Sequence, residues 1–195
     1  MCLRLVGSEM CIRDRDLEAI IAAIKVGTIN AKINVVVSNK KDAFILKRAK
    51  KHDLNAKYLS DRLISRDEYA KVLTNTFSKN NVNLILLIGF MKILSNSFCR
   101  VWQNKILNVH PSLLPKYSGG INNNVHKQVL RNGDKETGCT IHYVTADVDS
   151  GPILIQKKCK VDIKDTVDSL KARVQDLEGK AFVQALNLIE GKNHA

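Results

Sequence analysis

Two polar residues, two positions apart in the chain, have side chains suited to chemistry. Asn108 and His110 lie in the run Ile106-Leu-Asn-Val-His-Pro111. Residues two apart in a strand point to the same face, so both are predicted to project together where Pro111 ends the strand. An amide and an imidazole can each donate a hydrogen bond to a carbonyl oxygen that becomes negative during acyl transfer. The same pattern also fits a plainer arrangement, in which Asn108 caps a turn and His110 is a core histidine.

A second candidate lies in the run Asp147-Val-Asp149-Ser-Gly-Pro152. Its composition predicts a turn, because Asp, Ser, Gly and Pro are typical turn residues. A carboxylate in such a loop can lie beside a histidine and favour its protonated form. Alternatively, Asp147 and Asp149 serve only to form the turn. Local sequence alone leaves both interpretations open.

Predicted strands and helices alternate along the 195-residue chain, and these elements must position the candidate residues. Strands that alternate with helices of about 10–15 residues indicate βαβ units and a mostly parallel sheet. The last two predicted strands follow a period of two, which is typical of a more exposed antiparallel pair. We therefore predict an α/β fold: a single Rossmann-like domain with a mostly parallel twisted sheet flanked by helices and an antiparallel C-terminal strand pair. Helices are predicted over residues 17–25, 42–51 (capped by Asp42), 67–79, 95–102 and 166–189, and strands over 33–37, 84–88, 106–109, 140–144 and 153–161.

Composition narrows the class of protein. Hydrophobic residues make up 45% of the chain, but no apolar run approaches the roughly 18–20 residues that span a bilayer. The five cysteines form no CxxC pair, which argues against a disulfide framework or zinc site and favours a reducing, cytoplasmic location. Arg4 and Glu9 interrupt the apolar start, so a signal peptide is not predicted.

The net charge of +12 comes from scattered basic residues. This distribution favours a solvated surface over attraction of an anionic small molecule, and nucleic-acid binding last. Other common catalytic patterns are missing from the sequence. It contains no GxGxxG or Walker loop, no nucleophile elbow and no His or Cys pair with metal-ligand spacing. We predict small-molecule substrates, no metal, no nucleic acid and no membrane.

Several segments together resemble one family. NVHPSLLPKYSGG and GCTIHYVTADVDSGPILIQ are similar to the glycinamide ribonucleotide formyltransferases, a branch of the folate-dependent formyltransferase superfamily. LLIGFMKILS, SRDEY and SLKARVQDLEG also match, and the resemblance runs from about Leu17 to the end of the chain. Related hydrolases resemble HHSFLP, and methionyl-tRNA formyltransferases resemble HGSLLP, where this chain has HPSLLP. The order of several motifs is more specific than any one motif alone.

The resemblance implies an activity. The family transfers the formyl group of 10-formyltetrahydrofolate to the amine of N1-(5-phospho-D-ribosyl)glycinamide in de novo purine biosynthesis, by direct attack of the amine. Asn108 and His110 would stabilise the oxyanion, His110 would donate a proton, and Asp149 would keep His110 charged. The folate is a co-substrate, no metal is required, and the protein would be a monomer or homodimer.

The resemblance also implies two sets of binding residues. Gln175 and Glu178, which share a helix face by their spacing of three, would contact the ribonucleotide. Lys92 stands where relatives often have arginine, which keeps the charge but loses bidentate geometry. The folate would contact Arg66, Met91, Lys92, Ile93, Leu94 and Asn108 together with Thr145, Ala146, Asp147, Val148 and Asp149.

The N-terminus departs from the family pattern. The family opens with an apolar strand and a GxGSN loop that binds the ribonucleotide phosphate at a helix N-terminus. Here Asp14-Arg15-Asp16 precedes Leu17, and VGSEMCIRDR resembles translated library-adapter sequence. We therefore expect residues 1–16 to be a non-family segment, with a genuine divergent N-terminus as the other interpretation, and residues 17–195 to be a formyltransferase domain without its usual first strand and glycine loop. A hydrolase of 10-formyltetrahydrofolate and a non-catalytic folate-binding remnant are the alternatives.

Overall fold

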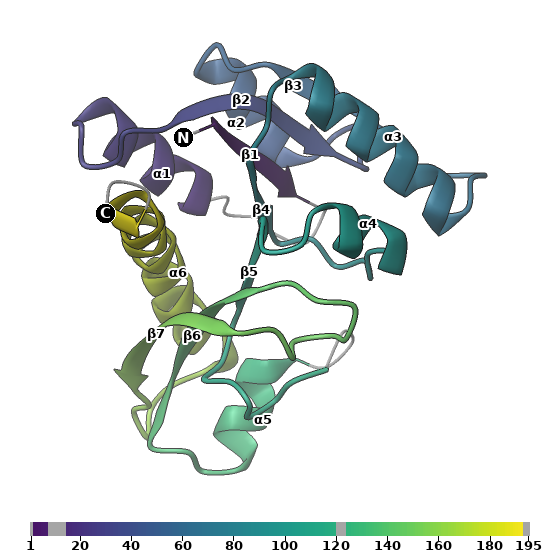
Figure 1. The fold of residues 1–195 in the computed structure, drawn as a ribbon. Helices are drawn as coiled ribbons and strands as arrows, with labels where there is room; N and C mark the ends of the chain where they lie inside the picture. The colour runs from purple at the N-terminus through teal and green to yellow at the C-terminus, as the bar shows by residue number, and fades with distance from the viewer. Residues whose placement is uncertain (1, 8–14, 120–123, 193–195) are drawn as a thin grey trace.

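A single seven-stranded sheet organises the chain (Figure 1). The computed structural model describes residues 2–7, 15–119 and 124–192. The strand order is β3-β2-β1-β4-β5-β6-β7, and among the described strands β6 is antiparallel to both β5 and β7 while the other neighbours pair in parallel. The predicted α/β fold with a mostly parallel sheet and an antiparallel C-terminal pair is confirmed. The strands are β1 (Cys2–Gly7), β2 (Lys32–Ser38), β3 (Ala56–Tyr58), β4 (Leu84–Ile88), β5 (Ile106–His110), β6 (Glu136–Tyr143) and β7 (Ile153–Lys160), and the helices are α1 (Arg15–Lys25), α2 (Phe44–Lys51), α3 (Arg66–Lys79), α4 (Asn96–Val101), α5 (Val125–Arg131) and α6 (Val167–Lys192).

The first strand corrects one expectation. Residues 2–7 form β1, which lies between β2 and β4 and is parallel to both (Figure 1). The expectation that residues 1–16 supply no first strand is therefore wrong for this stretch. One charged residue does not prevent pairing, because neighbouring strands offer unpaired backbone groups that need partners. The expected absence of the glycine loop concerns positions 8–14, which lie outside the described residues.

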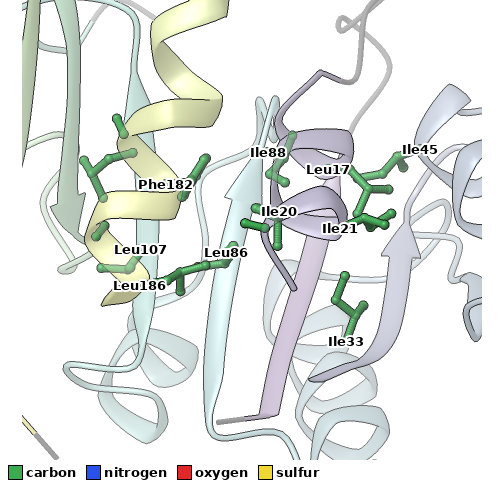
Figure 2. Packing of buried hydrophobic residues seen from close by; sticks show 14 of the residues in the cluster. Leu17, Ile20, Ile21, Ile33, Ile45, Leu86, Ile88, Leu107, Phe182 and Leu186 are labelled. Carbon is green, nitrogen blue, oxygen red and sulfur yellow. The ribbon is translucent and has the colours of Figure 1, made fainter. Parts of the chain in front are cut away.

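One face of the sheet packs against α1, α2 and α6. Alternate residues of β4 point to this face, where Leu86 and Ile88 meet Leu17 and Ile20 of α1 (Figure 2). Further along, Leu107 of β5 packs near Phe182 and Leu186 of α6 (Figure 2). These side chains are buried, which explains the continuous apolar run of β4: a parallel strand covered on both faces has no polar side.

The other face is covered by α3 and α4. Ile85 and Leu87, the remaining alternate residues of β4, pack here with Phe77, Phe98 and Trp102. The Phe77 and Phe98 rings meet edge to face with centroids 5.7 Å apart, a favourable arrangement of aromatic quadrupoles. The two faces therefore follow directly from the two-residue period of the strand.

Capping side chains explain the starts of α3 and α4 but not the start of α2. Ser65 caps α3 in a full capping box with Glu68, and Ser95 caps α4. The predicted cap of α2 by Asp42 is wrong: the cap position is Ala43, and no side chain bonds there. Helix α2 begins two residues later than predicted because the buried side chains of Ile45, Leu46 and Ala49 set its position against the sheet.

The C-terminal pair differs from the sequence prediction in its exposure. β6 is almost wholly buried, whereas β7 alternates between exposed and covered residues. The predicted exposed setting therefore holds for β7 alone, since β6 lies inside the sheet between β5 and β7 whereas β7 is its edge strand. β3 and α5 were not predicted, because both are short. Among the described residues, no helix is long and apolar enough to cross a membrane.

Candidate active site

The candidate residues of β5 share a face with β6. In the antiparallel ladder, Asn108 stands opposite His142, and His110 stands opposite Thr140. Directly opposite residues of a ladder project to the same side, so all four side chains lie on one face. The neighbours Leu107 and Ile141 point the other way, into the core beneath α6. The predicted common face of Asn108 and His110 is confirmed by this register.

His110 and Asp149 form a buried pair. Nδ1 of His110 lies 3.2 Å from Oδ2 of Asp149, and their side chains are 8% and 10% exposed. The same carboxylate oxygen accepts a hydrogen bond from the Gly119 amide at 3.0 Å. On the far side of the ring, Nε2 lies 3.1 Å from the Tyr117 carbonyl oxygen. A carbonyl only accepts, so Nε2 carries a proton, and both ring nitrogens of His110 face acceptors.

The electrostatics of Asp149 follow from these contacts. Burial acts to raise the pKa of Asp149, but the hydrogen bond and charge of His110, together with the Gly119 amide, lower that pKa overall. The backbone of Asp149 is left-handed, with φ of 53°, which Asp tolerates better than most residues. The turn between β6 and β7 thus delivers a charged carboxylate to the imidazole, as the sequence interpretation required.

His142 is a member of the cluster that sequence reasoning left undecided between core and surface. Its Nε2 lies 3.2 Å from Nδ2 of Asn108 and 3.7 Å from Oδ1 of Asp149. Its Nδ1 lies 2.9 Å from the Tyr143 carbonyl oxygen. Burial is the main cause that lowers the pKa of His142. His142 connects Asn108 to Asp149, and its period-two spacing from Thr140 was the one sequence signal for it.

A cavity of about 330 Å³ contains most of the predicted folate-contacting positions of the β4–α4 loop. Arg66, Lys92, Ile93 and Leu94 all line it, and Lys92 pairs with Asp61 at its edge. Met91 and the loop residues Thr145, Ala146, Asp147 and Val148 are exposed and do not line this cavity. The Asp147 carbonyl instead accepts hydrogen bonds from Thr145 and Ser150 within the loop.

The two predicted ribonucleotide residues lie on α6 in different settings. Glu178 is buried, and burial raises the pKa of its carboxyl group to about 7, although the charges of His110 and Lys171 oppose this. Gln175 is half-buried. Gly179 lets α6 approach α1 closely, because a Cβ there would lie 2.8 Å from Cβ of Ala19. This brings the middle of α6 beside the beginning of α1. Among the described residues, no group of three or more His, Cys, Asp or Glu side chains could hold a metal ion.

Comparison with known proteins shows which family this chain belongs to. Residues 12–186 match the family model described as formyl transferase. The chain belongs to the formyl transferase family. It is 40% identical over 164 residues to the phosphoribosylglycinamide formyltransferase of Escherichia coli, covering 84% of this chain and 76% of that protein. The glycinamide ribonucleotide transformylase 1 structure from Symbiobacterium toebii superposes with a TM-score of 0.91 at 32% identity, covering 98% of this chain and 88% of that one.

Larger relatives contain the same domain. The trifunctional purine biosynthetic protein adenosine-3 of Gallus gallus is 41% identical over 175 residues, which is 89% of this chain but 17% of that protein. The chain therefore spans about a sixth of the length of this relative. A formyltetrahydrofolate deformylase from Pseudomonas syringae superposes with a TM-score of 0.85 at 22% identity, which shows the shared fold alone.

Proposed function

We propose that this chain transfers the formyl group of 10-formyltetrahydrofolate to the amine of N1-(5-phospho-D-ribosyl)glycinamide, a step of purine biosynthesis. The observation that carries the proposal is the cluster in which Asn108 and His142 meet His110 and Asp149 on one face of β5 and β6. Family membership and the E. coli relative support the same reaction.

The hydrogen-bonding role of His110 follows from its partners. Nε2 donates to the Tyr117 carbonyl, and Nδ1 faces the charged carboxylate of Asp149. Both acceptors are satisfied when both ring nitrogens carry protons. Because Nε2–H is bound to the Tyr117 carbonyl, Nδ1–H is the ring donor that a substrate oxygen can share with Asp149.

The reaction proceeds by direct addition. The substrate amine attacks the formyl carbon, and the former carbonyl oxygen gains negative charge. Asn108 and the Nδ1–H of His110 donate to that oxygen, and loss of one such donor typically costs about 10²–10³-fold in rate. The added amine then loses a proton to the Asp149 carboxylate, and the folate nitrogen leaves with a proton that His110 supplies. A positioned general acid of this kind contributes roughly 10²–10⁴-fold. Asp149, 3.2 Å from Nδ1 of His110, then passes its proton to the ring, so His110 is charged again for the next turnover and no net proton is gained or lost.

The positions of the predicted binding residues lead to proposed contacts with the folate and the ribonucleotide. Arg66 and Lys92 would bind the folate at the cavity after β4, with Ile93 and Leu94 against its apolar parts. Met91 and residues 145–148 would contact it from outside the cavity. Gln175 and Glu178 would bind the ribonucleotide beside the start of α1. The proposal that residues 1–16 lack the family's phosphate loop predicts weaker ribonucleotide binding than in relatives with GxGSN.

The compartment and the oligomeric state of the enzyme are part of the proposal. Cys99, Cys139 and Cys159 are free thiols, in keeping with a reducing compartment. We propose that the enzyme works in the cytoplasm on small-molecule substrates, as a monomer or homodimer.

The decisive experiment compares folate turnover with and without the amine substrate. The purified chain is mixed with 10-formyltetrahydrofolate, and tetrahydrofolate and formate are quantified in the presence and absence of the ribonucleotide. We expect turnover only with the amine, no formate, and a loss of at least about 10²-fold in His110→Ala. Formate release without the amine would establish a hydrolase instead. Folate binding with no turnover under either condition would establish a non-catalytic folate-binding domain.

A further inference from the structure

We propose that His142 is a positioning residue: its neutral imidazole accepts a hydrogen bond from the Asn108 amide and so keeps the amide nitrogen turned toward the reacting formyl oxygen. This inference rests on the proposed formyl transfer and adds a fourth residue to its machinery. His142 acts through Asn108 and need not touch either substrate, since its side chain is 2% exposed.

The backbone fixes which nitrogen of His142 carries the proton. Nδ1 lies 2.9 Å from the carbonyl oxygen of Tyr143, the next residue in β6. A carbonyl oxygen cannot donate, so Nδ1 is the protonated nitrogen of the neutral ring. Nε2 then presents a lone pair, and the neutral ring is an acceptor on the side that faces β5.

That lone pair selects the orientation of the Asn108 amide. Nε2 of His142 lies 3.2 Å from Nδ2 of Asn108, directly across the β5–β6 ladder. An amide turned the other way would place its oxygen against the lone pair, two acceptors facing each other. With one N–H bound to His142, the second N–H of Asn108 stays available as a donor. The cross-strand contact therefore sets whether Asn108 offers an N–H or an oxygen to the site.

Protonation of His142 would remove this control. The charged groups that act on His142 among the described residues are Asp149, from the β6–β7 turn, and His110, from β5. A proton on Nε2 would face the Asn108 N–H and turn toward Oδ1 of Asp149, now 3.7 Å away. The ring would then compete with His110 for the same carboxylate. Burial, the largest cause, and the charge of His110 lower the pKa of His142 and so favour the neutral form, against the opposing effects of the Tyr143 carbonyl and of Asp149.

A matched pair of substitutions separates this role from simple packing. His142→Gln places an amide oxygen near the position of Nε2 and keeps an acceptor. His142→Met has a similar length and no strong acceptor. In the formyl-transfer assay we expect kcat of the Met variant to fall by about tenfold or more, a part of the loss typical of a missing oxyanion donor. We expect KM for both substrates within about threefold of the parent, and the Gln variant to recover most of kcat.

The Asn108→Ala background tests whether His142 acts through Asn108. Adding His142→Met to Asn108→Ala should cause no further loss, because the amide to be oriented is gone. Multiplying losses, or equal losses in the Gln and Met variants, would overturn the proposal and leave His142 as a packing residue.

Nitrogen-15 NMR of the full chain supplies a readout that needs no activity. We expect His142 to show an unprotonated Nε2 and a protonated Nδ1 at neutral pH. We also expect the side-chain amide signals of Asn108 to move in His142→Met and to stay near the parent positions in His142→Gln. A protonated Nε2, or Asn108 signals that ignore both substitutions, would refute the assignment. If the parent transfers no formyl group, the proposed function fails, and these signals still decide the role of His142.

Discussion

Replacing Asp149 by asparagine removes one charge while keeping the size of the side chain. In the parent protein, Oδ2 lies 3.2 Å from Nδ1 of His110 in a mostly buried site. Two unit charges at this distance attract by about 5 kcal/mol at an effective dielectric constant of about 20. The net effect is smaller, because burial of Asp149 opposes its charged form. An opposite charge this close typically displaces a titration by about 1–3 pH units.

The sign of the pH effect is fixed by the charges. The pKa of Asp149 is lowered, so its carboxylate is charged from weakly acidic to alkaline pH and stabilises a positive charge beside it. Asparagine carries no charge, so this stabilisation is lost in the variant. We expect the alkaline limb of the pH–rate profile to move down by about 1–2 pH units. The variant should therefore lose about 10–100-fold more activity at the alkaline end of the profile than at its acidic end.

The assay is the kcat of formyl transfer, measured across the pH range for the parent and Asp149→Asn. Asp168→Asn, an exposed carboxylate at the start of α6, makes the same change in net charge and should leave the profile in place. Parallel profiles for the parent and Asp149→Asn, offset by one constant factor, would show that the Asp149 charge does not set the alkaline limb.

Two further predictions concern stability. Gly179→Val should lower the melting temperature by several degrees, because its Cβ would lie 2.8 Å from Cβ of Ala19 and overpacking costs about 1–3 kcal/mol; an unchanged melting curve would contradict the close packing of α1 and α6. Asp165→Asn should cost about 1–2 kcal/mol of unfolding free energy at neutral pH, since Asp165 accepts two hydrogen bonds from Arg173 at 2.6 and 2.7 Å. Arg173 lowers the pKa of Asp165, so this stabilisation is present above the ordinary carboxyl range and is lost as pH falls through the lowered value. Denaturant titrations of parent and variant should converge in strong acid, and a constant difference at every pH would argue against the ion pair.

Local periodicity was sufficient to predict much of the site. Asn108 and His110 share a face because side chains alternate along any strand, and no knowledge of the rest of the molecule is needed. The apolar run of β4 and the capping box of Ser65 are local in the same sense. The contact of Asp149 with His110 could not be predicted from local sequence alone, because a turn composition does not say which histidine the turn will reach.

The features that sequence missed depend on distant partners. β1 contains Arg4, and the sequence alone predicted no strand there. In the structure, β1 completes the sheet between β2 and β4. His142 joins the cluster through its register opposite Asn108, and register across strands cannot be read from one strand alone. The burial of Glu178 likewise depends on how α6 packs in the folded chain.

The most direct measurement of the central claim follows the formyl carbon itself. The chain is incubated with 10-formyltetrahydrofolate labelled with carbon-13 in the formyl group and with the ribonucleotide, and the label is located by NMR. We expect the label in the N-formyl amide of the ribonucleotide product, at a rate that falls by at least about 10²-fold in His110→Ala. Label recovered as free formate, or transferred equally well by His110→Ala, would contradict this expectation.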